Sequence, residues 1–419
     1  MLRDLIIGWY GETTYEVLRV IGYLYPLWFP PLLAWMFWEV WLRYIRYLFF
    51  ANTKYVLLEI RLPKEITKSP VAMELVIQGL YQTGGESNFF AKYWEGKVRA
   101  WFSLELVSIG GEVHFYIWTR ANMRNIVEAQ VYAQYAEVEI REVEDYTRPV
   151  AYDPEKNEIW SCEYTLTNPD PLPIKTYIDY GLDRDPKEEH ENNPLSTVVE
   201  TLSSIKPTEN IWVQFVIRAH KKEKRGGFLS KAQDWSGEVD SLRKRFFTSV
   251  KDEGRTTLTD EEKKLVDALH RSVQKYAFDT GIRALYIANK GAYDNTTVTS
   301  IRGLLRPFST GYAGKLEEVE LGKVQRHYSA FNSFKPNGAP DFDYPWEDYK
   351  DIRANYIRRN ALDAYKRRMY FYAPYEMKSM VLTTEELATM FHFPGATVAS
   401  PGLDRIQSKR AQAPTNLPT

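Results

Sequence analysis

The stretch nearest to a phosphate-binding loop is STGYAGKLEE, residues 309–318. Ser309 stands where such a loop has its first glycine, and Leu316 stands where a Ser or Thr holds magnesium. The glycine matters because the loop's backbone N–H groups must approach the phosphates closely. The sequence therefore predicts that this chain does not hydrolyse nucleotides by itself.

Metal and nucleophile chemistry also lacks its usual residue patterns. No histidine shows HExxH spacing or lies beside a cysteine pair, and the acidic clusters lack the spacing and glycine of a calcium loop. Cys162 has no evident base partner. We therefore expect no catalytic residue, no metal ligand and no cofactor, and we expect that the protein is not an enzyme. The residues weighed are His114, His190, His220, His270, His327, His392, Asp183, Asp185, Glu188, Glu189, Asp341, Asp343, Glu347, Asp348 and Asp351.

Basic residues gather in four places, the last of which holds Arg405, Lys409 and Arg410, and tyrosines accompany the third in YIRRNALDAYKRRMYFYAPY. Interleaved basic and aromatic residues suit contacts to a nucleic-acid backbone and to stacked bases. The same pattern suits an ordinary helix that packs by its tyrosines, and we favour that interpretation because nearby acidic residues weaken the field. The candidate nucleic-acid contacts are Lys221, Lys222, Lys224, Arg225, Arg243, Lys244, Arg245, Arg358, Arg359, Lys366, Arg367 and Arg368.

Composition limits the partners and the compartment. The chain has 419 residues, with 54 basic and 55 acidic side chains and a net charge of −1. A global attraction to nucleic acid is therefore absent, and only local patches could supply one. The length suggests two or three domains. A single cysteine excludes an internal disulfide framework and fits a reducing compartment.

The segment from Val20 to Trp38 carries no charge, and spanning a bilayer takes roughly 20 apolar residues of helix. We expect a single N-terminal anchor in the cell (inner) membrane, within residues 20–50, after an amphipathic segment at 1–19. Because prolines interrupt the segment, Leu32–Phe50 is a competing candidate for the embedded stretch. A buried core helix and a helix that lies flat at the membrane interface are the alternatives to an anchor. The basic residues after the segment place the body in the cytoplasm. The anchor residues are Trp28, Trp35, Trp38, Arg43 and Arg46.

The body shows a repeated order of elements. Residues 51–150 predict strand, helix, two strands that meet at Gly110–Gly111, helix and strand, which is the ferredoxin-like order. Residues 151–318 predict a second such unit, with Asn193 capping a helix before Pro194 and a helical-hairpin insertion at about 221–277. Residues 319–393 predict a wrapping segment with C-terminal helices, and 394–419 a linker-like tail. The fold class expected is α+β: an N-terminal membrane helix followed by two tandem ferredoxin-like (βαββαβ) units.

The stretch Thr383–Pro418 resembles the segment that precedes the motor domain in membrane-anchored conjugation-type ATPases. These are the VirD4/TraG-like coupling proteins and their VirB4- and HerA-like relatives of candidate-phyla-type bacteria. The residues that carry the resemblance are Glu385, Glu386, Leu387, Ala388, Phe391, His392, Phe393, Pro394, Arg405, Ile406, Lys409, Pro414, Asn416, Leu417 and Pro418.

The family's translocase activity depends on Walker A and B motifs, which this sequence lacks. The resemblance therefore implies an accessory, non-catalytic, membrane-anchored module of a type IV secretion or DNA-translocation apparatus. Its motor ATPase would act in trans or be lost, and DNA and further copies of the chain are expected partners. A membrane-associated DNA-binding protein, a membrane scaffold unrelated to DNA and an unrelated membrane enzyme remain as alternatives.

Overall fold

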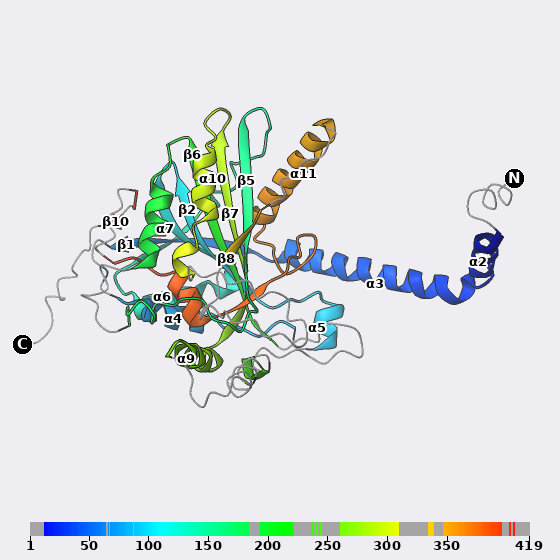
Figure 1. Cartoon of the computed structure of the whole chain (residues 1–419), viewed down its shortest axis with the longest axis horizontal. Coiled ribbons are helices and arrows are strands. Elements are labelled where there is room, and N and C mark those ends of the chain that lie inside the picture. The colour runs from blue at the N-terminus through cyan, green and yellow to red at the C-terminus, as the bar shows by residue number, and fades with distance from the viewer. Residues whose placement is uncertain are drawn as a thin grey trace, which may run out of the picture. The chain divides into compact units, whose positions relative to one another are not determined.

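The structure is a computed structural model. It describes residues 12–63, 66, 68–86, 88–183, 193–221, 237, 239–241, 244, 260–309, 334–338, 347–395, 402–403 and 405–406. The chain divides into two compact units, one formed by 1–53 with 84–98 and the other by 54–83 with 99–419. Each unit is described by itself (Figure 1).

The first unit contains the helices α2 (Glu12–Tyr23), α3 (Tyr25–Asn52) and α5 (Phe89–Tyr93). Leu24 separates α2 from α3, and prolines lie in the first turn of α3 and further along it. Asn88 begins α5 by accepting a hydrogen bond from the Ala91 N–H at 2.8 Å. Many apolar side chains of α2 and α3 are exposed, among them Trp28 and Trp35.

The prediction of an N-terminal membrane anchor is wrong. Among the described residues, no helix is both long and apolar enough to span a bilayer. The charge-free segment is divided at Leu24, and tryptophans, prolines and Glu39 lower the hydropathy of α3. The expected localisation in the inner membrane with a cytoplasmic body, which rested on this anchor, is overturned with it. Trp28, Trp35 and Arg43 lie exposed, and Trp38 and Arg46 lie half-buried.

The second unit is built on one large β-sheet, in which all neighbouring strands are antiparallel except β1 and β10. Eight strands follow one another in the order β10-β1-β3-β2-β6-β7-β5-β8, while β4 also pairs with β1 and β9 with β7. Figure 1 shows β6, β7 and β5 side by side. The strands are β1 (Tyr55–Pro63), β2 (Trp101–Ile109), β3 (Glu112–Arg120), β4 (Glu139–Val143), β5 (Asn157–Leu166), β6 (Glu209–Ala219), β7 (Ala277–Asn289), β8 (Phe334–Gly338), β9 (Met380–Thr383) and β10 (Arg405–Ile406).

Local turn and cap chemistry sets several of these elements. Gly110 and Gly111 have φ values of +60° and +96°, which favour glycine, and they join β2 to β3 as the sequence predicts. Asn193 caps α7 by accepting a hydrogen bond from the Leu195 N–H, with Pro194 next in the first turn.

The prediction of two tandem ferredoxin-like units is also wrong, because the sheet is larger than two such units. β2 and β6 pair along Trp101–Ile109 and join both halves into one sheet, and β9 and β10 extend it. The physical reason lies in these two strands. Both are buried almost along their whole length, so each satisfies its backbone groups against the other.

Helices cover the two faces of the sheet differently. One face forms the main hydrophobic core with α4, α6, α7, α10 and α12. The other face is contacted by the end of α11 and the chain that follows it, since Trp101 donates to the Arg368 carbonyl and Arg283 to the Met369 carbonyl. The helices are α4 (Pro70–Gly79), α6 (Arg124–Gln134), α7 (Pro194–Ser203), α9 (Asp260–Gln274), α10 (Asn295–Arg302), α11 (Glu347–Lys366) and α12 (Thr384–Met390), with 3-10 turns η1 (Ala121–Met123) and η2 (Arg306–Phe308).

Candidate functional site: a buried carboxylate cluster

The best-defined polar site lies around α12, in the stretch that carries the family resemblance. Thr383 begins this helix with a capping box: its hydroxyl accepts from the Glu386 N–H, and its own N–H donates to Glu386 Oε2 at 2.7 Å. A capping box satisfies two backbone donors that the start of a helix leaves open. Every residue of α12 is buried. The cap therefore fixes the start of a helix that belongs to the core.

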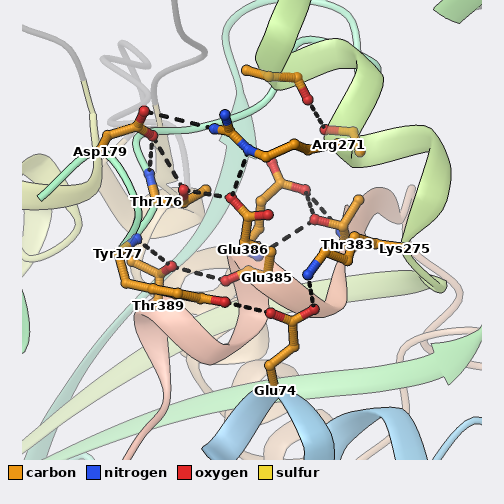
Figure 2. Close-up of polar contacts among 12 residues, drawn as sticks. Glu74, Thr176, Tyr177, Asp179, Arg271, Lys275, Thr383, Glu385, Glu386 and Thr389 are labelled. Atoms are coloured by element: carbon orange, nitrogen blue, oxygen red, sulfur yellow. Dashed lines mark hydrogen bonds and ion pairs between the residues drawn. The ribbon is translucent and has the colours of Figure 1, made fainter. Parts of the chain in front are cut away.

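Three buried glutamates meet here, Glu74 from α4 and Glu385 and Glu386 from α12. We call these three residues the carboxylate cluster (Figure 2). Their exposed fractions are 5%, 4% and 3%. Burying a carboxylate is costly unless it is hydrogen-bonded or paired. The partners of the cluster therefore decide what it can do.

Donors from the loop around residues 174–179 and from α12 hydrogen-bond to the cluster. Tyr177 Oη donates to Glu74 Oε2 at 2.5 Å, and Thr384 Oγ1 donates to Glu74 Oε1 at 3.1 Å. Thr176 Oγ1 donates to Glu385 Oε1 at 2.6 Å, and the Ile174 N–H donates to Glu386 Oε1 at 3.0 Å. The loop around residues 174–179 is thus held to both helices. A further hydrogen bond runs from the Tyr177 N–H to the Thr389 hydroxyl.

The chain at and just beyond α9 supplies the two cations of the site. Lys275 Nζ lies 2.6 Å from Glu74 Oε1. Arg271 lies 3.8 Å from Asp179 Oδ1 and 3.9 Å from Glu385 Oε1. The predicted insertion therefore reaches α4 through the Lys275–Glu74 ion pair and α12 through the Arg271–Glu385 ion pair, as Figure 2 shows.

Burial controls the titration of the two glutamates on α12. It raises the pKa of Glu386 to about 7, against backbone N–H bonds that lower this pKa. Burial also raises the pKa of Glu385 above its ordinary value, while Thr176 and Arg271 act in the opposite direction. Glu386 is therefore close to half ionised near neutral pH.

The cluster is built to hold helices together. Its oxygens accept hydrogen bonds from protein groups, and a carboxylate that is occupied in this way has few acceptor positions left for a substrate. Within the described part of the chain, no group of three or more His, Cys, Asp or Glu residues could hold a metal ion. The arrangement links α4, α9, α12 and the loop around residues 174–179.

His392, in the FHFP part of the same stretch, is also buried and hydrogen-bonded within the protein. Asn193 Nδ2 donates to His392 Nε2 at 2.8 Å, and His392 Nδ1 donates to the Ala388 carbonyl at 3.0 Å. Burial lowers the pKa of His392 to about 4, so the ring is neutral at physiological pH. It ties the end of α12 to the start of α7.

A second buried polar group lies against the opposite face of the sheet, around Arg368. We call Arg368, Glu105 and Asp145 the arginine cluster. Arg368 Nε donates to Glu105 Oε1 at 3.0 Å, and its guanidinium also pairs with Asp145. Tyr146 Oη donates to Glu105 Oε2 at 2.7 Å. The side chains of Arg368 and Glu105 are fully buried.

The arginine cluster removes Arg368 from the candidate nucleic-acid contacts, because a buried guanidinium cannot reach a phosphate. Of the other candidates, Lys221, Lys244, Arg359 and Arg367 are exposed, and Arg358 and Lys366 are half-buried. Arg367 pairs with Asp363 one turn earlier. The candidates that lie outside the described residues are Lys222, Lys224, Arg225, Arg243 and Arg245.

The remaining residues weighed for chemistry have ordinary surroundings where the structure describes them. His114 pairs with Glu59 at 3.1 Å, and His220 pairs with Asp279 at 2.7 Å. Burial raises the pKa of Cys162 to about 12, so its thiol stays protonated at neutral pH. His190, His327 and most of the acidic clusters lie outside the described residues, as does nearly all of STGYAGKLEE.

Sequence reasoning missed Glu74, Lys275, Glu105 and Asp145 as members of buried clusters. One signal was present: Glu74 adjoins Met73 in a helix whose apolar positions predict burial. Glu105 gave no such signal, because its alternation with Leu104 and Leu106 is equally typical of a solvent-facing position. Searches with the sequence find no matching protein-family model and no matching curated protein.

Proposed function

We propose that this protein is a non-catalytic module of a type IV secretion or DNA-translocation apparatus, and that it acts with a HerA- or VirD4-like motor ATPase supplied by another chain. The proposal starts from the resemblance of Thr383–Pro418 to the segment that precedes the motor in such ATPases. The sequence has no Walker A motif, so the energy of translocation would come from the partner.

The observation that carries the proposal is the burial of the first part of this segment. Glu385, Glu386 and His392 each hold a specific partner, and Leu387, Phe391 and Phe393 belong to the main hydrophobic core. The motif is thus part of the folded body. The chain that follows this buried element is therefore attached at its start to the folded body. Such a fixed attachment suits a body that positions a motor.

The chain just after this element stays on the sheet where it is described. Arg405 donates to the Gly395 carbonyl at 2.7 Å, and Arg405 and Ile406 pair in parallel with Leu62 and Pro63 of β1. Leu403 forms a bridge with Val113. The segment around Leu403–Ile406 therefore lies at the β1 edge of the sheet. We propose that the motor binds at this edge.

Co-expression with the HerA- or VirD4-like ATPase encoded nearest to this gene tests the proposal. We expect a stable complex by size-exclusion chromatography with light scattering, and we expect Arg405→Glu with Lys409→Glu to weaken it at least ten-fold. Arg359→Glu with Arg367→Glu is the matched control, since it changes the same charge on exposed side chains of another segment. Absence of a complex at micromolar concentration, with no change in the ATPase rate, would overturn the proposal.

A further inference from the structure

The carboxylate cluster holds more negative than positive charge. Among the described residues, the ion pairs of Glu74, Glu385 and the neighbouring Asp179 involve two cations, Arg271 and Lys275, and Glu386 lies in the same cluster. Lys275 pairs with Glu74, and Arg271 is shared between Asp179 and Glu385. Glu386 forms no ion pair with any cation of the described chain. A fully ionised cluster would therefore bury at least one carboxylate whose charge nothing offsets, which is unfavourable in a low-dielectric interior.

The hydrogen bonds of Glu386 can serve both of its protonation states. Its Oε2 lies 2.8 Å from the Thr383 hydroxyl, which can either donate or accept. The ionised carboxylate accepts from this hydroxyl, and the neutral carboxyl can donate to it instead. The Ile174 N–H can donate to Oε1 in either state. Protonation thus removes the buried charge while the contacts with Thr383 and Ile174 persist.

We infer that the carboxylate cluster is a proton-dependent latch, which holds α12 against α4 and the loop around residues 174–179 when Glu386 is neutral and releases α12 more readily when Glu386 is ionised. The groups that face the latch from the packed elements are Glu74, Tyr177, Asp179, Asp183, Arg271, Lys275 and Glu385. The inference concerns this chain alone and goes beyond the proposed function, because it holds with or without a motor partner.

The direction of the pH effect follows from where the proton binds more tightly. Burial raises the pKa of Glu386 to about 7 when α12 is docked, whereas an exposed glutamate has its ordinary value of 4.5. The docked state thus keeps its proton at pH values where the open state has lost it. Docking is favoured at low pH and weakens as the pH rises through this window. Linkage gives about a ten-fold increase in the opening equilibrium between pH 6 and pH 8 from the titration of Glu386 alone.

Hydrogen exchange on the full chain measures this opening. Exchange rates of the α12 amides and of the loop around residues 174–179, corrected for the intrinsic effect of pH, should report the ten-fold rise between pH 6 and pH 8. Glu386→Gln keeps the shape of the side chain but removes its titration, so the opening equilibrium of this variant should no longer rise between pH 6 and pH 8. Glu376→Gln, at an exposed position, should behave like the unaltered protein.

A second measurement keeps the inference testable if Glu386→Gln does not fold. Infrared spectra of the unaltered protein should show a protonated carboxyl C=O band that disappears with a midpoint near pH 7. A flat exchange profile, or a band that has already vanished by pH 5, would overturn the latch. The complex with the ATPase could still form in that case, so the two proposals fail independently.

Discussion

Arg368 lies two residues beyond the end of α11 and has a backbone conformation that favours glycine, at φ = +52°. Its N–H donates to the Tyr365 carbonyl, and the next N–H donates to the Ala364 carbonyl, which closes the helix. An arginine at this position accepts some backbone strain because its guanidinium joins Glu105 and Asp145. The side chain thereby fixes the end of α11 on the sheet.

Replacing Arg368 by methionine should lower the free energy of unfolding by roughly 3–5 kcal/mol, because Glu105 would stay buried without its cation. Urea unfolding followed by circular dichroism measures the loss. Arg367→Met is the control at the neighbouring position, where an exposed pair with Asp363 contributes at most about 1 kcal/mol. Equal losses for the two variants would contradict the role assigned to the arginine cluster.

Sequence reasoning could recognise the residue types of both clusters but not their partners. In the sequence, Arg368 is one of the candidate nucleic-acid contacts because it lies in a run of basic and aromatic residues, although the same run suits an ordinary packed helix. Its true partners lie 223 and 263 positions away along the chain. Such separations leave no periodic signal in the sequence, so only the fold reveals the pairing.

At the scale of elements, α5 is held to α3 by aromatic contacts within the first unit. Trp41 Nε1 donates to the Tyr93 carbonyl at 3.0 Å, and the Trp41 and Trp94 rings lie 5.9 Å apart. Gly96 follows with φ = +64°, and a Cβ there would lie 2.5 Å from the Ile45 carbonyl oxygen. The Trp38 ring also lies 5.5 Å from that of Tyr93, so two tryptophans of α3 and one close backbone approach hold the short helix.

Trp41→Ala should loosen α5 without unfolding the sheet unit. The variant loses one hydrogen bond and an aromatic pair, which together correspond to about a ten-fold or greater rise in local opening. Limited proteolysis should then cut within residues 84–98 faster than in the unaltered protein. Trp35→Ala, at a side chain that is 61% exposed, should leave the cleavage rate unchanged. Faster cleavage in both variants would mean that α5 does not depend on Trp41.

At the scale of the whole molecule, the pairing of β2 with β6 makes the second unit one sheet. The ladder runs from Trp101 opposite Arg218 to Ile109 opposite Asn210. Both strands face core on both sides, so separating them would expose apolar side chains and backbone groups together. The two halves should therefore unfold as one cooperative unit.

Hydrogen exchange in increasing urea tests this cooperativity. Amides of β3 and β7, which lie on opposite sides of the β2–β6 ladder, should lose protection at the same urea concentration. Val213→Asp buries a charge at the ladder and should shift both strands equally to lower urea. Val143→Asp makes the same change at the half-exposed end of β4 and should have a smaller effect. Separate midpoints for β3 and β7 would show two independent units.

The sequence by itself determined the local elements: the turn at Gly110–Gly111, the cap at Asn193 and the alternating strands follow from short-range preferences. It misjudged the membrane anchor, because an absence of charge is not the same as high hydropathy when tryptophan, tyrosine and proline fill the segment. Only the tertiary structure decided that β2 pairs with β6, that Arg368 is buried and that Glu386 forms no ion pair with a cation of the described residues. Each of these depends on contacts between distant segments, whose free energies favour closing one large sheet with buried polar clusters on both faces.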